Sequence, residues 1–214
     1  MPVPRGRPPA HTRPQIVAAA IAIADAEGLD ALTMRRLATE LDAGVMSLYT
    51  YVRDKEDLLD QMVEQVSEFD PADGGDGLIG LVRWQRALML RHPWMPAALP
   101  NRRLGGPNML GHLERGLAAL EHTGLPGPAK MEILALLTGF VASYVSNEVV
   151  QARAGVTDTQ RIAEHVERLR EAVLSGAYPR LAKVMSEGAT APPPNFEAIA
   201  SRMIAGLLGD RPGG

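Results

Sequence analysis

Hydroxyl, basic and amphipathic side chains gather in residues 33–52, where they could bind a phosphate backbone and read base edges. The segment TMRRLATELDAGVMSLYTYV is typical of a helix capped by Thr33, a short break at Asp42-Ala43-Gly44, and a second helix. With Val45 and Leu48 facing the core, the outer face of the second helix carries Ser47, Thr50 and Tyr51. This is the arrangement of a helix-turn-helix, whose second helix enters the major groove of DNA.

A basic arm precedes this segment. Residues 1–13 contain Arg5, Arg7 and Arg13 and no acidic residue. An extended Gly/Arg/Pro strip of this kind can enter the narrow minor groove of A·T-rich DNA. The alternative is an unstructured tail whose basic residues add only non-specific affinity for phosphate.

The rest of the sequence lacks several common catalytic or metal-binding motifs, namely thiolate sites, helical histidine pairs, nucleophile elbows and phosphate loops. There is no cysteine, which excludes a thiolate nucleophile, a thiolate metal site and a disulfide. None of the five histidines has an acidic residue or another histidine three or four positions away, which argues against the simplest helical metal site. Nucleophile-elbow and phosphate-loop motifs are missing from the sequence. We therefore predict a protein that is not an enzyme and that needs no metal or cofactor.

The composition is that of a soluble globular protein. The 214 residues are 46% hydrophobic and 22% charged, with a formal net charge of −3. Residues 1–55 carry a net charge of +1 and the remainder −4, so the basic character is concentrated at the front. The most apolar stretch, residues 133–145, is shorter than the roughly 18 residues of a membrane span, and the front shows no signal-peptide pattern. These features predict a cytoplasmic protein without a membrane partner.

Clusters of glycine and proline divide the chain into helical segments. Strand signals are weak, with three Phe, four Tyr and two Trp and little β-branched alternation. We therefore predict an all-α fold of about nine or ten helices. The expected helices span about 14–27, 33–41, 45–52, 54–69, 78–92, 94–99, 107–123, 128–154, 159–176 and 196–208.

Residues 14–60 resemble the N-terminal domain of the TetR family of bacterial transcriptional repressors. The matching residues come in the family's order: Gly28-Leu29-Asp30-Ala31-Leu32-Thr33, Arg36-Leu37-Ala38, Leu48-Tyr49, and Lys55 before Leu58-Leu59. One difference lies at the turn, where Asp42-Ala43 replaces the usual Gly-Val pair and Gly44 can supply the turn instead. The C-terminal part is similar to the tetracycline-repressor type of C-terminal domain, through His92-Pro93-Trp94, Gly106-Pro107-Asn108 and Gly139-Phe140.

The resemblance implies a domain organisation and a function. Residues 1–13 would be the basic arm, 14–55 a three-helix helix-turn-helix domain, and 56–214 a larger helical domain for ligand binding and dimerisation. The protein is expected to be a homodimeric, ligand-responsive repressor that a small-molecule effector releases from a double-stranded DNA operator. The alternative from another class is a small-molecule-binding helical protein whose helix-turn-helix is vestigial.

The resemblance also assigns DNA contacts. The positions that match phosphate contacts are Thr33, Tyr49, Thr50, Tyr51 and Lys55. The positions that match contacts near base edges are Arg35, Val45, Met46 and Ser47. Physical chemistry agrees for Lys55, a cation beside a helix N-terminus, and for Arg35, because Arg pairs with guanine. Tyr49 and Val45 can instead belong to the core, and Arg36 can be a solvated helix residue.

Two apolar stripes in the C-terminal half are expected to pair the subunits. One lies on residues 128–154 and the other on residues 196–208, and together they suggest a four-helix seam. The alternative is a core within one subunit. The stripes consist of Ile133, Leu134, Leu137, Val141 and Val145, and of Ile199, Met203, Ile204, Leu207 and Leu208.

A ligand site is expected in the same half. Aromatic walls, adaptable methionines and a few polar groups suit a drug-sized apolar molecule, although each residue alone could equally serve core packing. The candidate ligand-binding residues are Trp84, Met89, His92, Trp94, Met109, His112, Phe140, Tyr144 and Glu148. Glu148 lies about where tetracycline repressors carry an acidic residue near their metal–drug complex. The other chelating positions are not matched, so tetracycline is not predicted.

Overall fold

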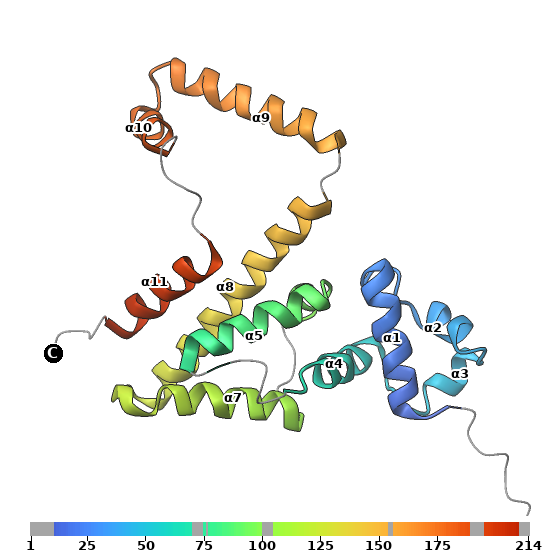
Figure 1. The fold of residues 1–214 in the computed structure, drawn as a ribbon. Coiled ribbons are helices and arrows are strands. Elements are labelled where there is room, and N and C mark those ends of the chain that lie inside the picture. The colour runs from blue at the N-terminus through green and yellow to red at the C-terminus, as the bar shows by residue number, and fades with distance from the viewer. Residues whose placement is uncertain are drawn as a thin grey trace, which may run out of the picture.

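The computed structural model describes residues 11–69, 75, 77–99, 105–153, 156–188 and 195–209, and every regular element in these ranges is a helix. This confirms the all-α prediction. A small head of three helices lies at one end, and α4 leads from it into a larger body (Figure 1). The helices are α1 (Arg13–Glu27), α2 (Met34–Glu40), α3 (Val45–Leu48), α4 (Lys55–Val66), α5 (Gly77–Arg91), α6 (Met95–Ala98), α7 (Pro107–Ala119), η1 (Glu121–Thr123, a 3-10 turn), α8 (Gly127–Arg153), α9 (Val156–Leu174), α10 (Pro179–Gly188) and α11 (Phe196–Gly209).

Local hydrogen bonds at the helix starts shape the head. Ahead of α1, Gln15 Oε1 accepts a hydrogen bond from the Thr12 amide at 2.8 Å, as the capping-box pattern predicts. Thr33 Oγ1 caps α2 by accepting from the Arg36 amide at 3.0 Å. The turn differs from expectation, since Gly44, which was expected to supply it, has a φ of −73° as the N-cap of α3. Asp42 has a φ of 47° instead, a left-handed conformation that a short polar side chain tolerates.

The second helix of the motif is shorter than predicted. α3 ends at Leu48, and residues 49–51 continue as turns rather than as α-helix up to residue 52. The Thr50 amide donates to the Ser47 carbonyl at 3.3 Å, three residues back, and the Thr50 hydroxyl donates to the same oxygen at 2.6 Å. Competition from such hydroxyl bonds weakens helix propagation.

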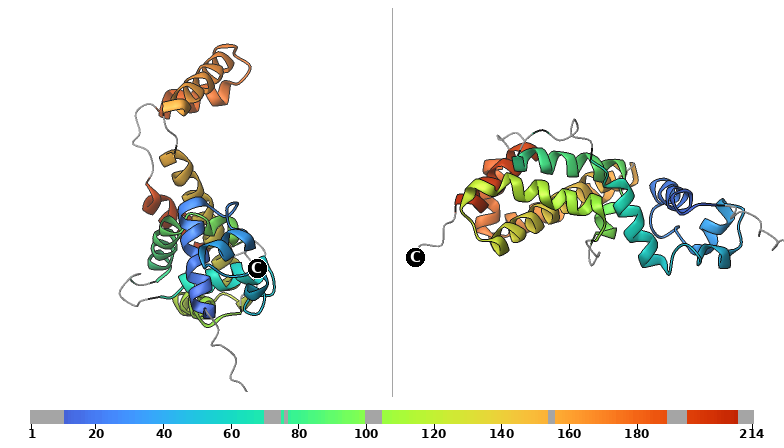
Figure 2. Two further views of the ribbon diagram at one scale, coloured as in Figure 1. Left: turned by 90° about the vertical axis from the view of Figure 1, so that its right-hand side faces the viewer. Right: turned by 90° about the horizontal axis from the view of Figure 1, so that it is seen from below.

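The helix α4 belongs to both parts of the molecule. Leu58, Leu59 and Met62 are buried and α4 packs along α1, whereas its C-terminal end contacts α6 and α7. Figure 2 shows α4 as the connection between the head and the body. The predicted boundary at residue 55 therefore falls at the first residue of a shared helix, and residues on both sides of it contribute to one head core.

The body is built around α5 and α8, with α7 and α11 packed against them. On α8, Leu137, Val141 and Val145 are at most 1% exposed, and they form one continuous core with Val82 of α5. The expectation that this stripe forms the dimer seam is thus wrong, because its neighbours lie within the same chain. On α11, Met203, Ile204 and Leu207 of the predicted stripe are half-buried against the same core, whereas Leu208 is 38% exposed.

One helix of the described residues, α8, is long and apolar enough to cross a membrane by length and composition alone. Core helices of soluble proteins pass the same test, and one side of α8 is the core stripe just described. Only 28% of its most apolar window is buried within the chain, so α8 leaves a second face uncovered.

A pair of helices, α9 and α10, stands off the body between α8 and α11 (Figure 1). The helix α10 was not predicted. Its signal was present, since Pro179 suits the first turn and Leu181, Val184 and Met185 recur at helical spacing.

Candidate DNA-binding surface and ligand cavity

The outer face of α3 is exposed. Met46 is 78% exposed, and Ser47, Thr50 and Arg35 are also exposed. Tyr49 is 44% exposed, which disfavours the core interpretation of this residue. Val45 and Tyr51 are half-buried and pack against the head core. The motif thus presents a mixed polar and apolar surface of the kind that reads base edges.

Three of the residues predicted to contact DNA, at phosphates or at base edges, already hold bonds within the chain. Lys55 Nζ donates to the Leu29 carbonyl at 3.2 Å, which leaves further donors on the ammonium. Ser47 Oγ donates to the Gly44 carbonyl at 2.6 Å, and the Thr33 hydroxyl caps α2. These bonds hold the side chains at the start of α4 and along α2 and α3. Arg5 and Arg7 lie outside the described residues.

Arg36 has a structural part in the head. Its guanidinium pairs with Glu40 at 2.7 Å and with Glu27 at 2.8 Å, which joins α2 to the end of α1. The hydrogen bond to Glu40, followed by that to Glu27, raises the pKa of Arg36. Arg36 is therefore a half-exposed residue that links α1 and α2 through ion pairs, rather than a free solvated cation.

An apolar cavity of about 310 Å³ lies in the body between α5, α7 and α8. Its volume is at the lower end of the range for small-molecule sites. Four of the nine predicted ligand-binding residues line it, namely Trp84, Met89, Met109 and His112. The other lining residues are Ser67, Gln85, Leu88, Met95, Leu99, Leu113, Met131, Leu134, Ala135 and Thr138.

The other five predicted ligand-binding residues do not line this cavity. Trp94 Nε1 donates to Asp25 Oδ1 at 2.7 Å and His92 Nδ1 lies 2.9 Å from the same oxygen, so both residues join the body to α1. Phe140 and Tyr144 instead pack against Phe196 at the start of α11, with ring centroids 5.8 and 5.1 Å away.

Glu148, too, holds helices of the body together instead of lining the cavity. Its carboxylate pairs in a bidentate manner with Arg86 of α5, at 2.9 and 2.6 Å. The guanidinium of Arg86 in turn lies over the Phe196 ring, 5.2 Å from its centroid. An acidic residue on this helix therefore fixes α5, α8 and α11 together. Sequence spacing could not reveal this, because it does not say which partner a charge meets.

A buried polar network crosses the cavity wall. Gln85 Nε2 lies 2.8 Å from His112 Nε2 and donates to Thr138 Oγ1 at 2.8 Å, and the Thr138 hydroxyl donates to the Leu134 carbonyl at 2.9 Å. Gln85 is 4% exposed and was missed by sequence reasoning. A glutamine among apolar residues of α5 was the available signal, because buried polar groups need partners.

Burial of His112 makes folding stability depend on pH. Desolvation, and then the nearby Arg115, lower the pKa of His112 from 6.5 to about 4. Between these values the unfolded chain takes up a proton that the folded chain does not, so stability is lost as pH falls. The loss approaches about 3 kcal/mol at pH 4. We expect the free energy of urea unfolding to fall more steeply from pH 7 to pH 4.5 in the wild type than in His112→Phe. Parallel curves would contradict the burial of a neutral imidazole.

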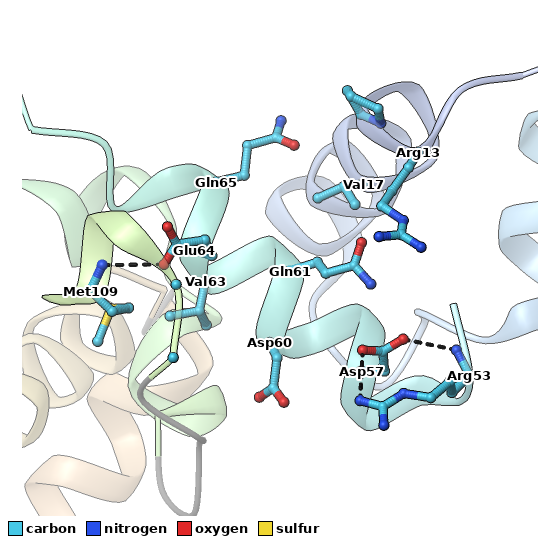
Figure 3. Close-up of a pocket in the computed structure, with 13 residues that line it drawn as sticks. Arg13, Val17, Arg53, Asp57, Asp60, Gln61, Val63, Glu64, Gln65 and Met109 are labelled. Atoms are coloured by element: carbon cyan, nitrogen blue, oxygen red, sulfur yellow. Dashed lines mark hydrogen bonds and ion pairs between the residues drawn. The ribbon is translucent and has the colours of Figure 1, made fainter. Parts of the chain in front are cut away.

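A second, wider groove of about 510 Å³ runs between the head and the body (Figure 3). At one side of it, the Glu64 carboxylate of α4 accepts hydrogen bonds from the amides of Asn108 at 2.6 Å and Met109 at 3.2 Å, at the start of α7. Asn108 Nδ2 returns a bond to the Glu64 carbonyl at 2.9 Å. A Cβ at Gly106 would overlap the Glu64 carboxyl group, so a larger residue here would have to displace that carboxylate. We call this contact the Glu64–α7 junction.

Metal ligands do not gather in the described part of the chain, where no three His, Asp or Glu side chains come together as a metal site. A helix-turn-helix head on a helical body that encloses a cavity is the architecture of a ligand-sensing transcriptional regulator.

Family comparisons agree with this class. Residues 16–62 match the family model "Bacterial regulatory proteins, tetR family", and residues 71–210 match "Tetracyclin repressor-like, C-terminal domain". The chain therefore belongs to the TetR family, and it is a DNA-binding transcriptional regulator.

Individual relatives extend the match over almost the whole chain. The repressor DrrR1 of Streptomyces coeruleorubidus is 37% identical over 194 residues, covering 86% of this chain and 72% of the relative. A regulator of Saccharopolyspora erythraea is 34% identical over 208 residues, covering 93% and 85%. Among solved structures, ActR of Streptomyces coelicolor is 29% identical. Its apo form has a TM-score of 0.73 and covers 95% of this chain and 97% of ActR, and its complex with actinorhodin has a TM-score of 0.76 and covers 93% and 96%.

Proposed function

We propose that this regulator is a homodimeric repressor that an aromatic small molecule releases from its operator. The position of Met109 carries the proposal. Met109 lines the ligand cavity, and its backbone amide donates to Glu64 on α4. A ligand that displaces Met109 therefore acts on the helix that holds the head. Such a ligand shifts the equilibrium only if it binds the two arrangements of α4 with different affinity. ActR, solved with actinorhodin, is a family member that holds a small molecule.

On DNA, α3 would lie in the major groove with Met46 and Ser47 toward base edges. The high exposure of Met46 supports this, because its side chain can meet a thymine methyl group. Tyr49, Thr50 and Lys55 would face phosphates. In the structure, the Thr50 hydroxyl donates to the Ser47 carbonyl. To donate to a phosphate oxygen, this hydroxyl proton would have to rotate away from that carbonyl.

Replacing Lys55 with Ala is expected to weaken binding to all DNA sequences about equally. The loss of one phosphate contact should lower the slope of log affinity against log salt by roughly one unit. Fluorescence anisotropy on two unrelated duplexes over a salt series measures both effects. As a contrast, Arg35→Ala should relax the preference at one base pair. Changed base preference in Lys55→Ala with an unchanged salt slope would refute the phosphate contact.

Dimerisation would use the uncovered faces of α8 and α11. Along α8, Ala135, Gly139, Ser143 and Ser146 are exposed and small, and α11 exposes Ala198, Ser201, Ala205 and Gly206 in the same way. Small side chains let helices of two subunits approach closely, and the two helices are already in contact within one subunit. A four-helix seam built from these faces would hold two heads about 34–36 Å apart, as two half-sites require.

Release from DNA tests the proposal directly. A duplex from the region upstream of the protein's own gene serves as the first target in a gel-shift assay at several salt concentrations. We expect a retarded complex that aromatic ligands dissociate at concentrations that saturate the cavity. A complex that persists when the cavity is shown to be full would refute release by ligand.

A further inference from the structure

Three buried polar atoms of residues that line the cavity have no hydrogen-bond partner among the described residues. They are Gln85 Oε1, His112 Nδ1 and Ser67 Oγ, on side chains that are 4%, 8% and 1% exposed. An unpartnered polar atom at such depth costs free energy, and a bound molecule can recover it. Gln85 and His112 are also in hydrogen-bond contact with each other, which makes this pair a recognition site rather than two separate defects.

The network fixes what each atom offers. Thr138 donates its only hydroxyl proton to the Leu134 carbonyl, so it must accept from the Gln85 amide nitrogen. The second hydrogen of that nitrogen points at His112 Nε2, which therefore accepts. A neutral imidazole that accepts at Nε2 carries its proton at Nδ1. Besides the Ser67 hydroxyl, which can donate or accept, the free atoms are thus one donor, His112 Nδ1–H, and one acceptor, Gln85 Oε1.

The rest of the cavity wall disfavours a charged ligand. None of the residues that line the cavity carries a charge at neutral pH, and most are apolar, with Trp84 as the aromatic surface. The His112 ring lies beside that indole, with centroids 5.1 Å apart. Burial also lowers the pKa of His112 to about 4, so its ring stays neutral. Arg115, which is near enough to His112 to lower its pKa, does not line the cavity, so a charged ligand would lose its hydration without a counter-ion in the cavity wall.

We propose that the cavity selects a neutral, planar aromatic ketone that also carries a hydroxyl group. The ketone oxygen accepts from His112 Nδ1–H, and the hydroxyl donates to Gln85 Oε1. This inference rests on the proposed function, because it names the effector class for the same cavity. It also assigns Gln85 and His112 as the residues that determine specificity, whereas Trp84 and the methionines supply apolar contact.

A matched series of tricyclic probes tests each bond in the wild-type protein. 2-Hydroxyfluorenone has both groups, 2-methoxyfluorenone lacks the donor, 2-hydroxyfluorene lacks the ketone, and fluorenone-2-carboxylate replaces the hydroxyl by a charge. By calorimetry, 2-hydroxyfluorenone should bind about tenfold or more tightly than each of the other three, since each leaves a buried polar group unpaired. Equal affinity across the series would overturn the proposal without any variant being made.

Variants assign the two bonds to their residues. Gln85→Met should abolish the preference for hydroxyl over methoxy and keep the preference for the ketone. His112→Phe should abolish the ketone preference, and His112→Asn, whose amide nitrogen can take the place of Nδ1, should restore it. Leu110→Met, at an exposed position of α7 that does not line the cavity, should leave both affinity ratios unchanged. The assignment would be overturned if Gln85→Met still preferred hydroxyl over methoxy, or if His112→Phe still preferred the ketone.

The same probes separate this inference from the proposed function. If 2-hydroxyfluorenone releases the protein from DNA while both ratios survive the two substitutions, then ligand-induced release holds and the hydrogen-bond assignment fails. If the ratios behave as expected but DNA is not released, then the recognition site stands and release by ligand fails.

Discussion

Gly139→Arg is expected to convert the dimer into a folded monomer without specific DNA binding. A Cβ at Gly139 would meet nothing within 4 Å inside the chain, so the substitution fits the single subunit. Arg also has a higher helix propensity than Gly, by roughly 0.5–1 kcal/mol, which favours α8 itself. In a close helix seam, however, the guanidinium would be buried without a counter-ion, and that costs several kcal/mol.

Three measurements follow this substitution. Light scattering should give a monomer mass, circular dichroism should stay helical, and operator affinity should fall at least about 100-fold, toward non-specific binding. Gly206→Arg on α11 should likewise give a folded monomer with weakened operator binding, since a Cβ added at Gly206 would also meet nothing within 4 Å. Gly111→Arg on α7 is the matched control, a helical glycine with equal room, and should remain dimeric. A dimeric Gly139→Arg that binds DNA normally would place the seam elsewhere.

Glu64→Ala is expected to uncouple ligand binding from DNA release. The substitution removes the carboxylate that accepts from the Asn108 and Met109 amides and so disconnects α4 from the cavity wall. Coupling between two sites in regulators typically changes affinity about 5- to 150-fold. In Glu64→Ala the ratio of operator affinities without and with ligand should fall toward one, while affinity for the ligand stays within about threefold.

The neighbouring substitution Gln65→Ala serves as the control, since Gln65 is exposed on the same turn of α4. Gly106→Ala should reproduce the Glu64→Ala result from the other side, because the added methyl group displaces the carboxylate. Anisotropy titrations of DNA with and without saturating ligand give the ratio. Full release in Glu64→Ala would show that the signal reaches α4 by another contact, such as the bonds of Asp25 to His92 and Trp94.

The head was predictable because its determinants are local. Thr12 with Gln15, Thr33 and Asp54 mark helix starts through bonds to residues three positions away, and these bonds are present. The exception is the turn, which was expected to use Gly44 but has its left-handed residue at Asp42. Composition points to glycine for a turn, yet it cannot show which residue between α2 and α3 takes the positive φ, because that depends on how α3 packs.

The body was less predictable because its site depends on how helices pack. Periodicity identified the α8 stripe as buried but could not say whether a partner subunit or the same chain covers it. Likewise, Glu148 and Tyr144 share a helix with cavity residues, but Glu148 pairs with Arg86 of α5 and Tyr144 packs against Phe196 of α11, whereas Gln85 lines the cavity from α5. Which side chains line the cavity and which face neighbouring helices depends on how each helix is rotated about its own axis.

The central claim, a dimeric DNA-reading regulator, is tested most directly by selecting bound duplexes from a random pool. We expect enrichment of an inverted repeat whose two half-sites are about one helical turn apart, bound by two chains. An unenriched pool, retained only through salt-dependent attraction, would contradict it and leave a small-molecule-binding protein with a vestigial helix-turn-helix.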